Sequence, residues 1–224
     1  MSWLGKIFVN PSFWSGKKAE SAYRHQHRYF KAVWNDNSYG LERLLRLFLC
    51  GVQFIYPVLF IREIFGRKGV AARKLAVEAY VVLKLLFPLI VLWTGLYRFP
   101  WVIALIVYLL TETTFHILNL IFLSDVHSAS VSYHRSILLL FLHYMETALD
   151  FAAVYIAFDL LSEPLNWVSA VYFSVVANTT VGFGDIHARG SAGQSVVIVQ
   201  LLICVLFIIL FINYFSQKIN VNDD

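Results

Sequence analysis

The sequence predicts an all-α membrane protein with about four transmembrane helices and one shorter helix that enters the membrane without crossing it. The chain of 224 residues is 59% hydrophobic and only 14% charged. A soluble domain of this size has too little interior to bury so much apolar surface. The hydrophobic residues also gather into long runs, and a helix needs about 20 such residues to cross the hydrocarbon of a bilayer.

Four runs are long and apolar enough to cross: Tyr80–Tyr97, Trp101–Leu123, Ser136–Leu161 and Ser195–Phe215. Between the last two lies Leu165–Asn178, which is apolar and aromatic but too short to span. Pro164 suits the first turn of a helix, where its missing N–H costs nothing. The pattern predicts a re-entrant pore helix whose C-terminal, negative dipole end points at an ion path.

The stretch T-T-V-G-F-G-D, residues 179–185, follows this predicted helix directly. An ion filter needs backbone carbonyls that face one axis in successive rings, and a threonine hydroxyl can add a further ring. Consecutive carbonyls can face one axis only if some residues leave the ordinary α and β conformations. Gly182 and Gly184 can do so at little steric cost, and they alternate with Val181 and Phe183.

This stretch closely resembles the filter signature of the tetrameric potassium channel family. With the flanking helices included, the resemblance covers roughly Ser136 to Lys218. Phe183 stands where most members carry tyrosine, and Ala177-Asn178 replaces a more usual Thr-x pair. The resemblance implies that K⁺, as permeant ion and not as cofactor, is coordinated in the filter by Thr180, Val181, Gly182 and Phe183, with Gly184 completing it. It also implies that the filter is supported by Tyr172, Phe173, Thr179 and Asp185.

The resemblance implies passive, potassium-selective permeation through a homotetramer, because one chain supplies one of the four filter loops. Two alternatives remain open: a membrane sensor or scaffold with a non-conducting vestigial pore, and a potassium transporter subunit. We expect no enzyme, because the chain has no nucleophile elbow, metal-ligand spacing or phosphate loop. We also expect no cofactor and no nucleic-acid partner. Cys50 and Cys204 lie in apolar runs and are expected to be buried free thiols.

Basic residues are concentrated in the N-terminal third of the chain. Residues 1–78 hold 13 of the 18 lysines and arginines and five acidic residues. By the positive-inside rule, we expect cytoplasmic N- and C-termini, and we expect Gly66–Glu78 to be a cytoplasmic loop. We therefore divide the chain into a basic interfacial region (1–78), two peripheral helices (79–124) and a pore domain (135–219) of a multi-pass plasma-membrane protein. The basic region is expected to contact membrane lipid, with anionic lipid as a candidate.

Leu44–Ile61 is an ambiguous apolar segment. As a fifth span it would place seven basic residues of positions 1–43 outside, against the positive-inside rule. We favour amphipathic helices that lie in the cytoplasmic membrane interface. Their candidate anchors are Trp3, Phe8, Phe13, Trp14 and Trp34.

Polar residues inside the spans form a second candidate site. Helical spacing places Glu112, His116 and Asn119 on one face of the second span. It likewise groups His143, Glu146 and Asp150 on the third, while Lys84 lies at similar depth in the first. Three interpretations remain open: a network that joins the helices, a proton- or ligand-sensing cluster, and a second permeation route. No span carries the arginine series of a voltage sensor, so we do not expect gating by that route.

The last span has neither glycine nor proline from Ser195 onward, and kinks usually trace to such residues. Cys204 stands where the resemblance places the hinge glycine, which favours control at the filter or by rigid-body tilting. Phe207 and Phe211 are candidates for a hydrophobic pore gate, and equally for packing on neighbouring helices. At the outer mouth, Asp159, Glu163 and Asp185 are candidates for a ring of carboxylates that attracts cations.

Overall fold

The computed structural model describes residues 20–36, 39–123, 133–162 and 166–222, without the side chains of Tyr133 and of residues 215–222. The described residues are mostly helical, and their strand-like pairing is limited to an isolated bridge between Leu161 and Ala188. Four helices are long and apolar enough to cross a membrane. The all-α membrane class is therefore confirmed. The chain divides into two compact units, with one boundary between Val82 and Leu83.

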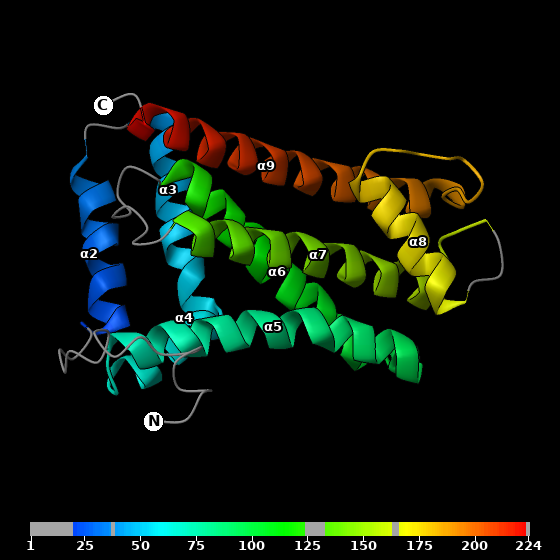
Figure 1. The fold of residues 1–224 in the computed structure, drawn as a ribbon, viewed down its shortest axis with the longest axis horizontal. Coiled ribbons are helices and arrows are strands. Elements are labelled where there is room, and N and C mark those ends of the chain that lie inside the picture. The colour runs from blue at the N-terminus through cyan, green and yellow to red at the C-terminus, as the bar shows by residue number, and fades with distance from the viewer. Residues whose placement is uncertain (1–19, 37–38, 124–132, 163–165, 223–224) are drawn as a thin grey trace. The chain divides into compact units, whose positions relative to one another are not determined.

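The described residues of the first unit form three short helices, a 3-10 turn and the start of a long helix. These are α2 (Ala22–Asn35), α3 (Gly40–Val52), η2 (Gln53–Ile55), α4 (Pro57–Gly66) and the first half of α5 (Val70–Thr94) (Figure 1). The side-chain amide of Gln26 on α2 donates to the Cys50 carbonyl at 2.9 Å. Glu63 of α4 accepts from the Ser21 hydroxyl at 2.9 Å and from the Ala22 N–H at 2.8 Å, so it holds the first turn of α2.

The ambiguous segment forms two helices with a sharp bend. The stretch Gly40–Ile55 and the helix Pro57–Gly66 meet at 67°. Tyr56 between them is extended (φ −93°, ψ 147°), as expected for a residue that precedes proline. The described residues therefore contain four candidate spans, or five if the bent pair is counted as one span. Among the proposed anchors, Trp34 is exposed, and Trp3, Phe8, Phe13 and Trp14 lie outside the described residues.

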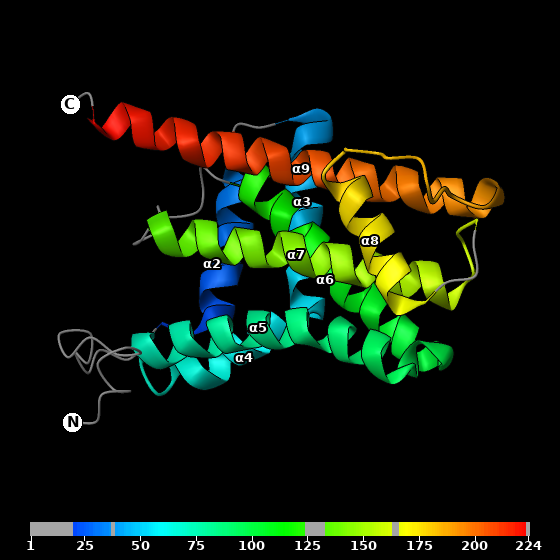
Figure 2. The same cartoon turned by 45° about the vertical axis from the view of Figure 1, so that its right-hand side comes forward.

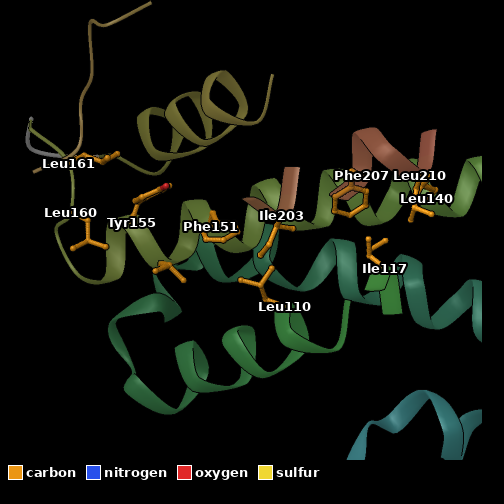
Figure 3. Close-up of a cluster of buried hydrophobic side chains, with 11 residues drawn as sticks. Leu110, Ile117, Leu140, Phe151, Tyr155, Leu160, Leu161, Ile203, Phe207 and Leu210 are labelled. Atoms are coloured by element: carbon orange, nitrogen blue, oxygen red, sulfur yellow. The ribbon is translucent and has the colours of Figure 1, made fainter. Parts of the chain in front are cut away.

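The second unit contains the rest of α5 and the helices that follow it. They are η3 (Leu96–Arg98), α6 (Pro100–Phe122), α7 (Tyr133–Ala157), α8 (Trp167–Asn178) and α9 (Gly190–Asn222). Helices α7 and α9 run antiparallel beside each other, and α8 contacts both near one end (Figures 1 and 2). Buried side chains from α6, α7 and α9 form a core that includes Ile117, Leu140, Phe207 and Leu210 (Figure 3).

Two helices start earlier in the chain than the apolar runs predicted. Helix α5 starts at Val70, so most of the loop predicted at Gly66–Glu78 is helical. Helix α9 starts at Gly190 and not at Ser195. Hydropathy marks only the apolar part of a span, whereas alanine, leucine, lysine and arginine, which fill residues 71–75, continue a helix into polar surroundings.

A close backbone approach fixes the start of α9. A Cβ atom added to Gly193 would lie 2.5 Å from the Leu160 carbonyl oxygen. That oxygen also accepts from the Arg189 N–H at 2.7 Å, so it has little freedom to move away. The residue at position 193 must therefore have no side chain.

We expect Gly193→Ala to lower the free energy of unfolding by about 1–3 kcal/mol, the usual cost of overpacking. Gly51→Ala is the matched control, because Gly51 is also helical and a Cβ there meets nothing within 4 Å. Alanine favours a helix over glycine, so Gly51→Ala should be neutral or slightly stabilising. Denaturation of the purified protein in detergent measures both. Equal stability of the two variants would contradict the contact.

Candidate ion pore and filter

Helix α8 has the length and the capping of a pore helix. Asn166 is its N-cap, and the side-chain oxygen of Asn166 accepts from the Ser169 N–H at 2.8 Å. Pro164 and Leu165, which the sequence placed in the first turn, lie outside the described residues. The helix ends at Asn178, where the Thr179 N–H still bonds to the Val175 carbonyl at 2.9 Å. Its carbonyl end, which carries partial negative charge, therefore leads directly into residues 179–185.

The backbone of residues 180–184 alternates in conformation. The φ angles of Thr180, Gly182 and Gly184 are positive, at 57°, 59° and 81°, whereas those of Val181 and Phe183 are not. This is the departure from ordinary backbone that the carbonyl argument required of the two glycines. Thr180 shares it although it carries a Cβ, which costs about 1–2 kcal/mol. Strain of this kind concentrates at functional sites, where the surrounding structure enforces it.

The surface of this stretch is open within one chain. Phe183 is 67% exposed and Val181 is 55% exposed. A Cβ added to Gly182 or Gly184 would meet nothing within 4 Å. Neighbouring groups of the same chain therefore do not enclose the stretch.

Tyr172 and Phe173 on α8 contact different parts of the structure. The Tyr172 hydroxyl donates to Asp185 at 2.8 Å, and its ring stacks on Phe183 at 6.4 Å between centroids. Phe173 instead meets Tyr155 of α7 edge-on at 5.1 Å. Adjacent residues point in different directions on a helix, so one aromatic contacts the filter stretch and the other contacts the supporting helix.

The hydrogen bond from Tyr172, with a backbone bond from Ile186 at 3.0 Å, holds the pKa of Asp185 below its usual value. The stabilisation from the ionised carboxylate is therefore complete above the unfolded-state pKa and is lost as the pH falls through the lower folded-state pKa. Removing the donor should raise the folded-state pKa towards its ordinary value.

We therefore expect Tyr172→Phe to move acid inactivation of ion flux to higher pH. Trp167→Phe is the matched control, since it changes an aromatic at the start of the same helix with no bond to Asp185. The measurement is flux from liposomes between pH 7 and pH 3. A Tyr172→Phe profile that overlays the wild-type profile would contradict the role given to this hydrogen bond.

The end of the pore helix is tied to both neighbouring helices by contacts that the sequence did not predict. The Asn178 carbonyl accepts from the Tyr144 hydroxyl at 2.7 Å and from the Cys204 thiol at 2.9 Å. The Asn178 side-chain oxygen accepts from the Gln200 amide at 2.7 Å. Cys50 and Cys204 are buried and free, as predicted, but Cys204 also has this polar partner. The one available signal was Gln200, a lone amide inside a long apolar run.

Asp159 was expected to contribute its charge to a ring of carboxylates at the outer mouth, but it is paired with an arginine. Its carboxylate pairs with the Arg189 guanidinium at 2.6 Å, so its charge is balanced locally. Asp159 also has a positive φ of 50°, a conformation that aspartate tolerates better than most residues. Glu163 lies outside the described residues. Asp185 is held by Tyr172 and Ile186.

The candidate gate residues pack against α7. Phe207 is fully buried and meets the Tyr144 ring edge-on at 5.4 Å, and Phe211 meets the same ring at 6.4 Å. Figure 3 places Phe207 among the core side chains. A residue that is already buried within its own chain has little surface to offer a pore. This geometry favours the packing interpretation for Phe207.

The polar residues of the spans meet around Lys84. Its ammonium lies 3.0 Å from Glu146 and 3.3 Å from Glu112, and donates to the Thr113 hydroxyl at 2.6 Å. Glu146 also accepts a hydrogen bond from the Thr113 hydroxyl at 3.0 Å, and it is hydrogen-bonded to the His143 ring at 2.8 Å. The cluster joins α5, α6 and α7.

Three other predicted members are not among the residues that bond directly to Lys84 or Glu146 in these contacts. The His116 ring lies 5.6 Å from the His143 ring. Asn119 donates to the Phe115 carbonyl of its own helix at 2.8 Å. Asp150 is buried, and its Oδ2 has no hydrogen-bond partner within the described part of the chain. The ion pairs across three helices favour the interpretation that the cluster holds the helices together. Within the same residues, no group of three or more histidine, cysteine or acidic side chains could hold a metal ion.

Residues 143–220 match a family model described as "Ion channel". The match supports an ion channel. It covers most of α7, all of α8, the filter stretch and nearly all of α9, which are the elements described above. Together with the four apolar helices, it supports a multi-pass membrane protein with a role in ion transport. Comparisons with curated proteins and with solved structures found no match.

Proposed function

We propose that this chain forms a potassium-selective channel in which K⁺ crosses the membrane passively through a homotetrameric pore. The observation that carries the proposal is T-T-V-G-F-G-D at residues 179–185, with alternating backbone conformation at Thr180, Gly182 and Gly184. Alternation of this kind allows successive carbonyls to replace the water around a dehydrated cation. The ion-channel match over residues 143–220 supports the same assignment.

In this proposal the filter carbonyls and the Thr180 hydroxyl bind the ion. The coordinating residues are Thr180, Val181, Gly182 and Phe183, with Gly184 turning the chain at the outer end. Tyr172, Phe173, Thr179 and Asp185 hold the filter from behind. K⁺ is the transported ion, and the mechanism uses no cofactor.

The tetramer follows from the pore geometry. One chain supplies one filter loop, and rings of carbonyls need four of them. Helix α9 also leaves a broad apolar surface uncovered in the single chain. Its exposed members are Ile198, Val199, Leu201, Leu202, Val205, Ile208, Ile209 and Ile212. Neighbouring copies and lipid would cover this surface.

The membrane placement of the proposal rests on charge. The concentration of lysine and arginine in residues 1–78 favours a cytoplasmic N-terminus, and an even number of spans then returns the C-terminus to the same side. A basic surface of this kind attracts anionic lipid by about 1 kcal/mol per residue near the membrane. We propose the plasma membrane as its location.

Reconstitution tests the proposal directly. Purified protein in liposomes should release K⁺ much faster than Na⁺, and external barium should block the release. Liposomes without protein set the background. A scaffold with a vestigial pore would give no flux above this background, and a transporter that couples two ions would give K⁺ flux that depends on the second ion. Either result would reject the channel.

A further inference from the structure

Gln200 is a fully buried amide in the first half of α9. Its Nε2 lies within hydrogen-bond distance of three oxygens of the pore helix: the Ser174 carbonyl at 3.0 Å, the Ser174 hydroxyl at 2.9 Å and the Asn178 side chain at 2.7 Å. Its Oε1 accepts from the Tyr155 hydroxyl of α7 at 2.6 Å. Both ends of the amide are therefore bonded to other helices.

Gln200 contacts the C-terminal end of the pore helix, immediately before the residues of the filter. Ser174 is itself held by a bond from its hydroxyl to the Ala148 carbonyl of α7 at 2.6 Å. Asn178 is the last residue of α8. The next residues bond back onto the same turn, Thr180 N–H to the Ala177 carbonyl at 3.0 Å and Val181 N–H to the Val176 carbonyl at 3.2 Å. Gln200 is thus connected to the first filter residues through one short, bonded turn.

Apolar surroundings make these bonds costly to break. Gln200 is flanked along α9 by valine, leucine and isoleucine, and no other amide side chain occurs between Ser195 and Phe211. A buried donor that loses its partner keeps the full cost of its desolvation, so the helices stay in the one arrangement that satisfies the amide. A channel that only needed α9 to pack on α8 would be served by an apolar side chain.

Building on the proposed channel, we infer that Gln200 is a positioning residue for ion selectivity. It fixes the end of the pore helix, and with it the Thr180 ring of the filter, relative to α7 and α9. Because α9 carries Gln200, a displacement of α9 also pulls on Asn178, so movement of this helix acts on the filter and not only on the cytoplasmic end of the pore.

The inference predicts that changing Gln200 alters selectivity while the tetramer persists. Gln200→Met keeps the volume and removes the polar atoms, and Tyr155→Phe removes only the bond to Oε1. Ser195→Ala is the matched control, because the Ser195 hydroxyl bonds only to the Ser191 carbonyl of its own helix. The readouts are the K⁺/Na⁺ permeability ratio and the rate of barium release, which a loss of stability alone leaves unchanged.

We expect Gln200→Met to lower the permeability ratio by about fivefold or more and to speed barium release. Tyr155→Phe should shift both readouts in the same direction by less, and Ser195→Ala should match wild type. If Gln200→Met fails to assemble, Tyr155→Phe carries the test. Wild-type selectivity and barium release in both variants would overturn the inference and leave the channel assignment intact. A wild-type protein that does not conduct K⁺ would instead reject the channel itself.

The Gln200–Asn178 bond has its own test in a double-mutant cycle. Asn178→Leu removes the acceptor of the shortest hydrogen bond that Gln200 donates. If the two residues act through this bond, Gln200→Met added to Asn178→Leu should change the permeability ratio less than Gln200→Met alone does. Fully additive effects in the cycle would contradict coupling between the two side chains.

Discussion

Gly184→Ala should abolish potassium-selective flux while the tetramer still forms. The φ angle of Gly184 is 81°, a conformation that costs a residue with a side chain about 1–2 kcal/mol. The strain would be repeated in every copy around the pore, and the chain would relieve it by turning a carbonyl away from the ion path. Since each 1.4 kcal/mol corresponds to a factor of ten and the strain is repeated in every copy, we expect K⁺ flux from liposomes to fall by far more than about tenfold, to the background level.

Gly95→Ala is the matched control for this substitution. Gly95 lies between α5 and η3 with a φ of 75°, and a Cβ at either glycine would meet nothing within 4 Å. The two variants therefore carry the same kind of backbone strain, and only one lies in the filter stretch. Gly95→Ala should lose some thermal stability and keep its selectivity. Wild-type K⁺ selectivity in Gly184→Ala would contradict the assignment of the filter.

Lys84→Met should be the most destabilising single substitution in the spans. The buried carboxylates of Glu112 and Glu146 both lie within 3.3 Å of the Lys84 ammonium, and without it they would face each other with no lysine between them. Breaking a buried ion pair by removing one partner typically costs about 3–5 kcal/mol. Titration of the purified protein with a denaturing detergent, followed by the fraction that stays folded, measures the loss.

A compensated variant separates lost charge balance from lost packing. Lys84→Met combined with Glu112→Gln and Glu146→Gln removes all three charges and keeps similar volumes. Replacing a complete buried ion network by neutral groups is often tolerated, so the triple variant should recover most of the stability. If it is as unstable as Lys84→Met alone, the packing of the lysine stem matters more than its charge. Unchanged stability in Lys84→Met would contradict the role of the cluster in joining α5, α6 and α7.

Local sequence patterns were enough to predict the helical spans and the backbone conformation of two glycines. Hydropathy located the four spans and the short α8, and it missed their polar extensions, such as the start of α5 at Val70. The G-x-G spacing predicted positive φ at Gly182 and Gly184 because only glycine adopts that conformation without strain. The positive φ of Thr180 had no such signal, since it is imposed by the surrounding turn and not by the residue type.

Contacts between distant segments could not be read from any pattern. The pairing of Asp159 with Arg189, the approach of Leu160 to Gly193 and the bonds of Gln200 each join residues separated by 20 or more positions. Their partners are determined by how helices pack, which depends on the whole chain. Helical spacing did place the charged residues of α6 and α7 on common faces, but only the packed helices show that Lys84 lies between Glu112 and Glu146.

The reversal potential of single channels tests the central claim most directly. Protein is fused into a planar bilayer with K⁺ on one side and Na⁺ on the other. The current should reverse far from zero, close to the equilibrium potential of K⁺. The same current should disappear in Gly184→Ala and persist in Gly95→Ala. A current that reverses near zero in the wild-type protein would contradict a filter built from the carbonyls of residues 180–184.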